Sequence, residues 1–142
     1  MIRYVAGFLY TPERTHVVLI QKNRPLWMRG RWNGVGGKLE PGESWDECMM
    51  REFREETGVL IPPSEWQHAV TIYNEHFECR FFRAFSAQVA EVDTVEDEVV
   101  GVHPLSGVHA LHTTNNVQWL VPLLASRGLQ FPLSIRDDLP EG

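Results

Sequence analysis

The chain has 142 residues and a mass of 16.3 kDa, which fits one domain (1–142), and 43% hydrophobic residues are enough to form a core. Its net charge of −6 and pI near 5.5 exclude a basic footprint for non-specific binding to duplex nucleic acid. An acidic protein can still bind polyphosphate where metal ions supply the positive charge.

The N-terminal third predicts a hairpin followed by a loop. Residues 2–10 and 15–21 are apolar and β-branched, with a short polar turn between them. The first of these segments is too short and wrongly flanked for a signal peptide or a membrane span, so we expect a strand, no membrane partner and a cytoplasmic location. Residues 22–34 are polar and aromatic, and we expect them to form a loop that leads to the functional site.

A helix is expected to begin near Trp45 and to end at Gly58. Ser44 has a glutamate three residues later, which is the sequence of a capping box, and glycine favours a helix end. Trp45, Met49 and Phe53 recur at i, i+4 and i+8, so this stripe is expected to pack against a sheet.

The same helix carries three carboxylates on one face. Glu52, Glu55 and Glu56 occupy positions i, i+3 and i+4, so they share an arc of roughly 100°. Like charges this close repel by a few tenths of a kcal/mol per pair, and a helix that only needed solvation would spread them out. Gly36 and Gly37 precede the helix and permit close approach of a ligand. The pattern therefore predicts a site for a hard divalent cation such as Mg²⁺ or Mn²⁺.

The remainder of the chain predicts an α/β fold with a mixed sheet. In order, we expect strands at 66–75 and 78–90, an acidic loop at 91–98, a strand at 99–103, a helix at 115–126 and a loose tail at about 132–142. Pro122 either argues against that helix or moves its expected start toward Leu120. Cys48, in the first helix, and Cys79, in a strand, have no metal-ligand spacing and are expected to be reduced packing residues.

The stretch from Gly37 to Val59 resembles the signature of the Nudix hydrolases. The pattern is Gly, five residues, Glu, seven residues, Arg-Glu-apolar-x-Glu-Glu-x-Gly-apolar. Its fixed positions are filled by Gly37, Glu43, Arg51, Glu52, Phe53, Glu55, Glu56, Gly58 and Val59. The resemblance implies an α/β/α sandwich with the motif as a loop-helix-loop, and an enzyme that hydrolyses a phosphoanhydride bond of a nucleoside diphosphate linked to another group.

The resemblance also implies roles for individual residues. The implied metal ligands are Glu52, Glu55, Glu56 and the carbonyl of Gly36. Catalytic work falls to Glu52, Glu55 and Glu98, the last of which is our choice in the acidic loop for a further metal ligand or base, with Glu96 second. The alternative for this loop is an ordinary solvated acidic segment.

The same resemblance implies that other residues of the motif region hold the loop in place or bind phosphate. Glu43 and Arg51 are expected to brace the loop against the helix, and Gly37 and Gly58 are structural. Lys38 follows the glycine pair and is either a phosphate contact or a solvent lysine.

The substrate is indicated by residues outside the motif. Residues 30–38 look like the MutT-type branch that hydrolyses oxidised purine nucleoside triphosphates, in which an Asn at the place of Asn33 contacts the base. Asn115 and Asn116 lie where such enzymes present Asn or Asp to the purine, although the animal enzymes carry an Asp pair there. Either residue could instead cap the following helix. Trp119, like Trp27, could stack on a base, but an apolar helix face favours Trp119 as a core residue.

The expected function is Mg²⁺-dependent cleavage of a (d)NTP to the monophosphate and pyrophosphate, with Mn²⁺ able to substitute. The alternative is another nucleoside diphosphate derivative: ADP-ribose, a nucleotide sugar, a dinucleoside polyphosphate or an RNA 5′ end. A non-catalytic nucleotide-binding module is a third reading, which the intact set of motif glutamates disfavours. The expected partner is a small nucleoside polyphosphate, and the chain is expected to be a monomer or a homodimer.

Overall fold

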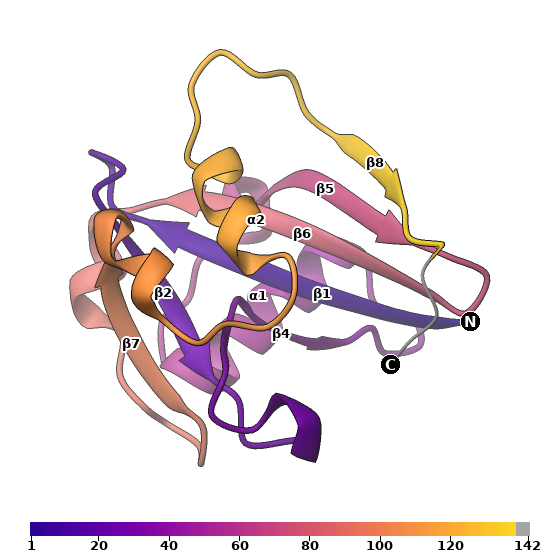
Figure 1. The fold of residues 1–142 in the computed structure, drawn as a ribbon, viewed down its shortest axis with the longest axis horizontal. Helices are drawn as coiled ribbons and strands as arrows, with labels where there is room; N and C mark the ends of the chain where they lie inside the picture. The colour runs from indigo at the N-terminus through magenta and orange to yellow at the C-terminus, as the bar shows by residue number, and fades with distance from the viewer. Residues whose placement is uncertain (139–142) are drawn as a thin grey trace.

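The computed structural model describes residues 1–138 and shows a mixed β-sheet with a helix on each face. Figure 1 shows α2 in front of the sheet and α1 behind it. This arrangement confirms the predicted α/β class and the sandwich that the motif implies. The elements are β1 (Ile2–Tyr10), β2 (His16–Gln21), β3 (Trp32–Asn33), β4 (Val35–Lys38), α1 (Trp45–Thr57), β5 (Gln67–Tyr73), β6 (Phe77–Phe85), β7 (Val99–Pro104), α2 (Val117–Leu124) and β8 (Leu133–Arg136).

Strand β1 is the centre of the sheet. Among the described residues the strand order is β3-β2-β1-β6-β5-β8, with β4 paired to β1 and β7 paired to β2. β1 runs parallel to β6 along its whole length and antiparallel to β4. The predicted hairpin of β1 and β2 is therefore confirmed only near its turn, where Tyr10 lies opposite Val17. The continuous apolar sequence of β1 suits a strand whose two faces are both covered by other elements.

Two hydrophobic clusters hold the helices on the sheet. On one face, Met49 and Phe53 of α1 are fully buried against Val5 and Leu9 of β1, which confirms the predicted packing stripe. On the other face, the apolar side of α2 covers Phe8 and neighbouring residues of the same strand. Alternate residues of β1 thus serve opposite layers, and α1 is fixed rigidly beside β4.

The start of α2 differs from the prediction. The helix begins at Val117, and Pro122 lies inside it instead of moving its start toward Leu120. The buried face of the helix outweighs the proline, because Val117, Leu120, Val121 and Leu124 all pack into the second cluster.

Two further expectations were wrong. Residues 133–136 are not part of a loose tail: β8 runs parallel to β5, with Val70 opposite Leu133, because the edge of β5 would otherwise expose its backbone groups. Residues 87–91 are a 3₁₀ turn capped by Ser86, so β6 ends at Phe85, before the predicted residue 90. The rest of the expected tail, residues 139–142, lies outside the described residues.

Both cysteines are free, as expected. No helix in residues 1–138 is long and apolar enough to cross a membrane.

Candidate active site

The loop before α1 is joined to the helix by local capping interactions. Ser44 Oγ accepts a hydrogen bond from the Glu47 N–H at 3.3 Å, and the Glu47 carboxylate accepts from the Ser44 N–H at the same distance. At the other end, Gly58 has a φ of 79°, the left-handed conformation that favours glycine. Both predicted ends of α1 are therefore confirmed, and the helix has a fixed register relative to β4.

Gly36 and Gly37 allow close contacts that a side chain would prevent. A Cβ at Gly37 would lie 2.4 Å from the carboxyl carbon of Glu52, so the glycine makes room for that carboxylate against the strand. A Cβ at Gly36 would lie 1.8 Å from the carbonyl oxygen of Val5 in β1. The first glycine thus serves the β1–β4 pairing, and the second serves the position of Glu52.

We expect alanine at these two glycines to have different effects. Gly37→Ala should leave the thermal midpoint nearly unchanged, because the displaced group is the end of a flexible side chain, but lower kcat/KM by about 10–100-fold through displacement of Glu52. Gly36→Ala meets backbone and should destabilise the fold by ~1–3 kcal/mol. Thermal unfolding and nucleotide turnover measured on both variants check this; a Gly37→Ala enzyme with full activity would contradict the assignment.

Arg51 joins the loop to the helix. Its Nε and Nη2 donate to the two carboxylate oxygens of Glu43 at 2.6 and 3.0 Å, and Nη1 donates to Glu52 Oε1 at 2.9 Å. Nη2 also donates to the carbonyl oxygen of Lys38 at 3.3 Å. Glu55 receives only a longer contact from Arg51, at 3.3 Å, and its side chain is half exposed. The contacts that Arg51 makes are those of a brace, as the motif implies.

The Arg51–Glu43 pair should make stability depend on pH in acid. Hydrogen bonding from Arg51 lowers the pKa of Glu43 from 4.5 to about 2. A lowered folded-state pKa gives a contribution that is present above 4.5 and lost as the pH falls toward about 2. We therefore expect Glu43→Gln to lower the thermal midpoint at pH 6 and to have progressively less effect below pH 4. Parallel melting curves of the two proteins between pH 2.5 and 6 test it, and a constant difference across that range would refute it.

Glu56 carries the least satisfied carboxylate of the site. Its Oε2 atom is buried and has no hydrogen-bond partner within residues 1–138. Burial, followed by the charges of Glu96 and Glu98, raises the pKa of Glu56 to about 7. Burial also raises the pKa of Glu52. Ionising these two buried carboxyl groups therefore costs free energy in the folded protein.

Glu98 turns inward from the acidic loop. Its side chain is only 9% exposed; Oε1 accepts a hydrogen bond from Lys22 Nζ at 3.0 Å and Oε2 accepts one from the Asn23 N–H. A simple solvated loop was therefore the wrong interpretation for Glu98, whereas Glu96 is exposed. Sequence reasoning missed Lys22, and the available signal was weak: it is one of two lysines in the chain and starts the polar loop before the glycines.

The donor set suits a hard divalent cation, although it is not preassembled. Within the described part of the chain, no three His, Cys, Asp or Glu side chains converge on one point that could hold a metal ion. Glu56 nevertheless offers an unpartnered buried oxygen, and its charged neighbours Glu52, Glu96 and Glu98 all oppose its ionisation. Oxygen ligands with excess negative charge are what Mg²⁺ and Mn²⁺ prefer.

The residues expected to contact a base come from two segments that are distant in the sequence but adjacent in the fold. The Trp32 N–H donates to the His112 carbonyl at 2.9 Å, and the Thr114 N–H donates to the Trp32 carbonyl at 3.0 Å. Residues 112–114 therefore run beside β3, which carries Asn33, and Asn115 and Asn116 follow them directly in the chain. The Oδ1 atom of Asn33 accepts from the Gly34 N–H at 2.8 Å.

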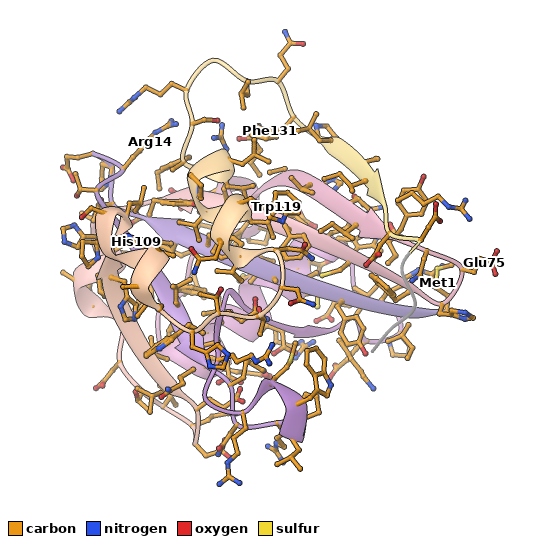
Figure 2. The ribbon with its side chains drawn as sticks, in the orientation of Figure 1. Met1, Arg14, Glu75, His109, Trp119 and Phe131 are labelled. Atoms are coloured by element: carbon orange, nitrogen blue, oxygen red, sulfur yellow. The ribbon has the colours of Figure 1, made fainter. Side chains whose placement is uncertain are left out.

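The segment before α2 presents Asn115, Asn116 and Trp119. Asn116 directly precedes the helix, with a φ of 78°, but its side chain caps nothing; Oδ1 instead accepts from the Trp119 indole N–H at 3.1 Å. Trp119 is 39% exposed, so the expectation that it lies in the core was wrong. The buried face of α2 is formed by other residues, Val117, Leu120, Val121 and Leu124. Figure 2 shows Trp119 at α2, in front of the sheet. Asn115 is exposed.

Lys38 and Trp27 are available at the surface. The Lys38 side chain is exposed at the end of β4, opposite Tyr4 in β1. Trp27 is 60% exposed in the loop between β2 and β3. Neither side chain is needed for the core.

Comparison with known proteins identifies related sequences and folds. The NUDIX domain family model matches residues 1–125. An uncharacterized Nudix hydrolase of Bacillus subtilis is 51% identical over 45 residues, which are 32% of this chain and 26% of that protein. An 8-oxo-dGDP phosphatase of Mus musculus is 38% identical over 60 residues, 42% of this chain and 18% of that protein. A CTP pyrophosphohydrolase of Escherichia coli is 33% identical over 66 residues, 46% of this chain and 47% of that protein.

The matched segments thus span less than half of each of these curated relatives. Among solved structures, a MutT protein studied in Aliivibrio salmonicida and Vibrio cholerae superposes with a TM-score of 0.74 at 22% identity, covering 87% of this chain and 96% of that one. That likeness supports the fold.

Proposed function

The chain belongs to the NUDIX domain family, and on that premise we propose that it is a divalent-metal-dependent hydrolase that cleaves a nucleoside triphosphate to the monophosphate and pyrophosphate. The observation that carries the proposal is the pair of desolvated carboxylates on α1, Glu52 against Gly37 and Glu56 with an unpartnered oxygen. Members of this family generally use divalent metal ions. We propose Mg²⁺, with Mn²⁺ as a substitute.

The proposed division of work follows from the surroundings of each carboxylate. Glu56, Glu52 and the carbonyl of Gly36 would hold the ion, with Glu55 and Glu98 as outer candidates. A bound ion would neutralise phosphate oxygens and lower the pKa of a water molecule. Glu52 is the best candidate for the base, because burial raises its pKa and Arg51 orients it. Both oxygens of Glu98 already accept hydrogen bonds, so a base role for it requires Lys22 to move.

We propose a purine nucleotide as the substrate because residues 112–114, which lead into Asn115 and Asn116, run beside the strand that carries Asn33. Asn33, Asn115 and Asn116 supply amides for a base edge, Trp119 supplies an exposed aromatic ring, and Lys38 an exposed ammonium for the phosphates. A relative that is named for 8-oxo-dGDP agrees with this choice. We expect the enzyme to act on small nucleotides in the cytoplasm, as a monomer or homodimer, without duplex nucleic acid.

A broader substrate class is the second candidate, and one observation favours it. The Oδ1 atoms of Asn33 and Asn116 both accept hydrogen bonds from within the protein, so a base edge must displace Gly34 N–H or the Trp119 indole to use them. A relative named for CTP shows that similar sequences need not act on purines. A dinucleoside polyphosphate, a nucleotide sugar, ADP-ribose or an RNA 5′ end would use the same glutamates.

Phosphate release from a nucleotide panel tests both candidates. The panel contains the common (d)NTPs, 8-oxo-dGTP, ADP-ribose, nucleotide sugars and dinucleoside polyphosphates, with Mg²⁺ or Mn²⁺ and with or without a coupling pyrophosphatase. Turnover of a triphosphate that appears only with the coupling enzyme supports the proposal. Preference for a sugar-linked or dinucleoside substrate would replace it with the broader class, and no metal-stimulated turnover of any compound would leave a nucleotide-binding module.

A further inference from the structure

Glu56 and its charged neighbours Glu52, Glu96 and Glu98, here called the carboxylate cluster, already have a nearby cation in the protein itself. Lys22 Nζ lies 3.0 Å from Glu98 Oε1, and the two side chains are only 21% and 9% exposed. The same ammonium partly offsets the repulsion that Glu96 and Glu98 exert on Glu56. A positive side chain therefore lies against Glu98, one of the carboxylates that the proposed function gives as a candidate ligand of the divalent ion.

We propose that Lys22 is a built-in counter-cation of this cluster, and that a divalent ion entering the cluster displaces the Lys22 ammonium from Glu98. The inference rests on the proposed function, because it takes Glu56 and its neighbours as the place where the ion binds. Two cations that share one largely buried carboxylate repel each other strongly, since water screens them poorly there. A divalent ion attracts the cluster more than a single ammonium does, so the lysine is the group that leaves.

The surrounding hydrogen bonds confine the movement to the side chain. The Lys22 N–H donates to the Arg31 carbonyl at 2.8 Å, and the Lys22 carbonyl accepts from the Gly30 N–H at 2.8 Å. These bonds close the base of the loop between β2 and β3 whether or not the ammonium holds Glu98. The Asn23 N–H keeps its bond to Glu98 Oε2, so the carboxylate stays oriented while Oε1 exchanges one cation for another.

This exchange gives Lys22 a role that the motif does not contain. With the ammonium in place, the carboxylates remain partly neutralised and Glu98 stays fixed. Once it leaves, Glu98 Oε1 is free for the ion or for a proton, and the ammonium is left at the rim of the site. Lys22 is thus a positioning residue that links metal loading to the state of Glu98.

The chain offers a direct test because Lys22 and Lys38 are its two lysines. Amine-reactive labelling of the whole protein, followed by mass spectrometry, gives the rate at each lysine without any substrate. Adding Mg²⁺, against KCl of equal ionic strength, should raise the Lys22 rate about fivefold, the factor that corresponds to ~1 kcal/mol for an ion pair, and leave the exposed Lys38 nearly unchanged. In Glu98→Gln, Lys22 should label fast with or without Mg²⁺.

Calorimetric Mg²⁺ binding on the same samples separates the two levels of the proposal. Binding without any change at Lys22 would overturn the displacement and leave the proposed function standing; absence of binding would overturn both. Lys22→Met should bind Mg²⁺ about fivefold more tightly than wild type, since it lacks the competing ion pair. Its matched control is Arg24→Met, which removes an exposed cation 3.8 Å from Asp97 and should change the affinity far less. Equal effects of the two variants would count against specific competition.

Discussion

Glu56→Gln is expected to lower turnover strongly while making the protein more stable. The amide keeps the shape of the side chain but loses the charge that a divalent ion requires, so we expect kcat to fall by about 10²–10³-fold, the range for removal of one preorganised electrostatic group. Steady-state kinetics at saturating Mg²⁺ and nucleotide measure this loss. Less than a tenfold fall would contradict the placement of the metal at Glu56.

The gain in stability follows from the raised pKa of Glu56. The folded-state pKa of about 7 lies above the ordinary 4.5, so the folded protein binds the extra proton more tightly than the unfolded chain does. The contribution of Glu56 to stability in wild type is therefore fully present below pH 4.5 and is lost as the pH rises toward 7. Glu56→Gln should remove this fall, with a thermal midpoint a few degrees above wild type at pH 8 and no gain at pH 4.5, in buffer with a metal chelator. A gain that is equal at both pH values would have another cause.

The glutamates of α1, whose charge lowers stability but serves function, are the part of the site that the local sequence predicts. Glu52, Glu55 and Glu56 share a face because of helical spacing, and the helix bounds follow from a capping serine and a terminal glycine. All of these signals act within one turn or one helix. The excess of like charge on α1 was therefore visible before any tertiary contact was known.

The other half of the site depends on contacts between distant segments. Glu98 is fixed by Lys22, which is 76 positions away in the chain, and no local pattern distinguishes it from the exposed Glu96. The sequence favours a core position for Trp119 because it lies on an apolar helix face, and only the packing of the helix decides which side faces solvent. β8 formed where polar residues and prolines favoured a tail, because the edge of β5 supplies its partner. Contacts between segments far apart in the sequence, which a local pattern does not show, decided each of these cases.

The largest loss of stability is expected from Phe53→Ala in α1. Phe53 is fully buried and directly follows Glu52 in the sequence, and its ring centroid lies 5.2 Å, edge to face, from that of Trp66. Removing a buried phenylalanine costs ~3–5 kcal/mol, through lost burial and the cavity that remains. For a chain of this size that corresponds to a fall of about 10 °C in the thermal midpoint.

Phe53→Ala should lower the thermal midpoint strongly but kcat only modestly, because Phe53 supports the helix and does not take part in the reaction. At a temperature where Phe53→Ala is still folded, α1 keeps its caps and its Arg51 contacts, so we expect kcat to fall by less than about tenfold. Arg54→Ala, an exposed truncation on the same helix, is the control and should shift the midpoint by less than ~2 °C. Thermal unfolding and kinetics of both variants decide the matter. If Phe53→Ala melts like the control, α1 is not held by this cluster, and the carboxylates must be positioned mainly by the loop that Arg51 and Glu43 brace.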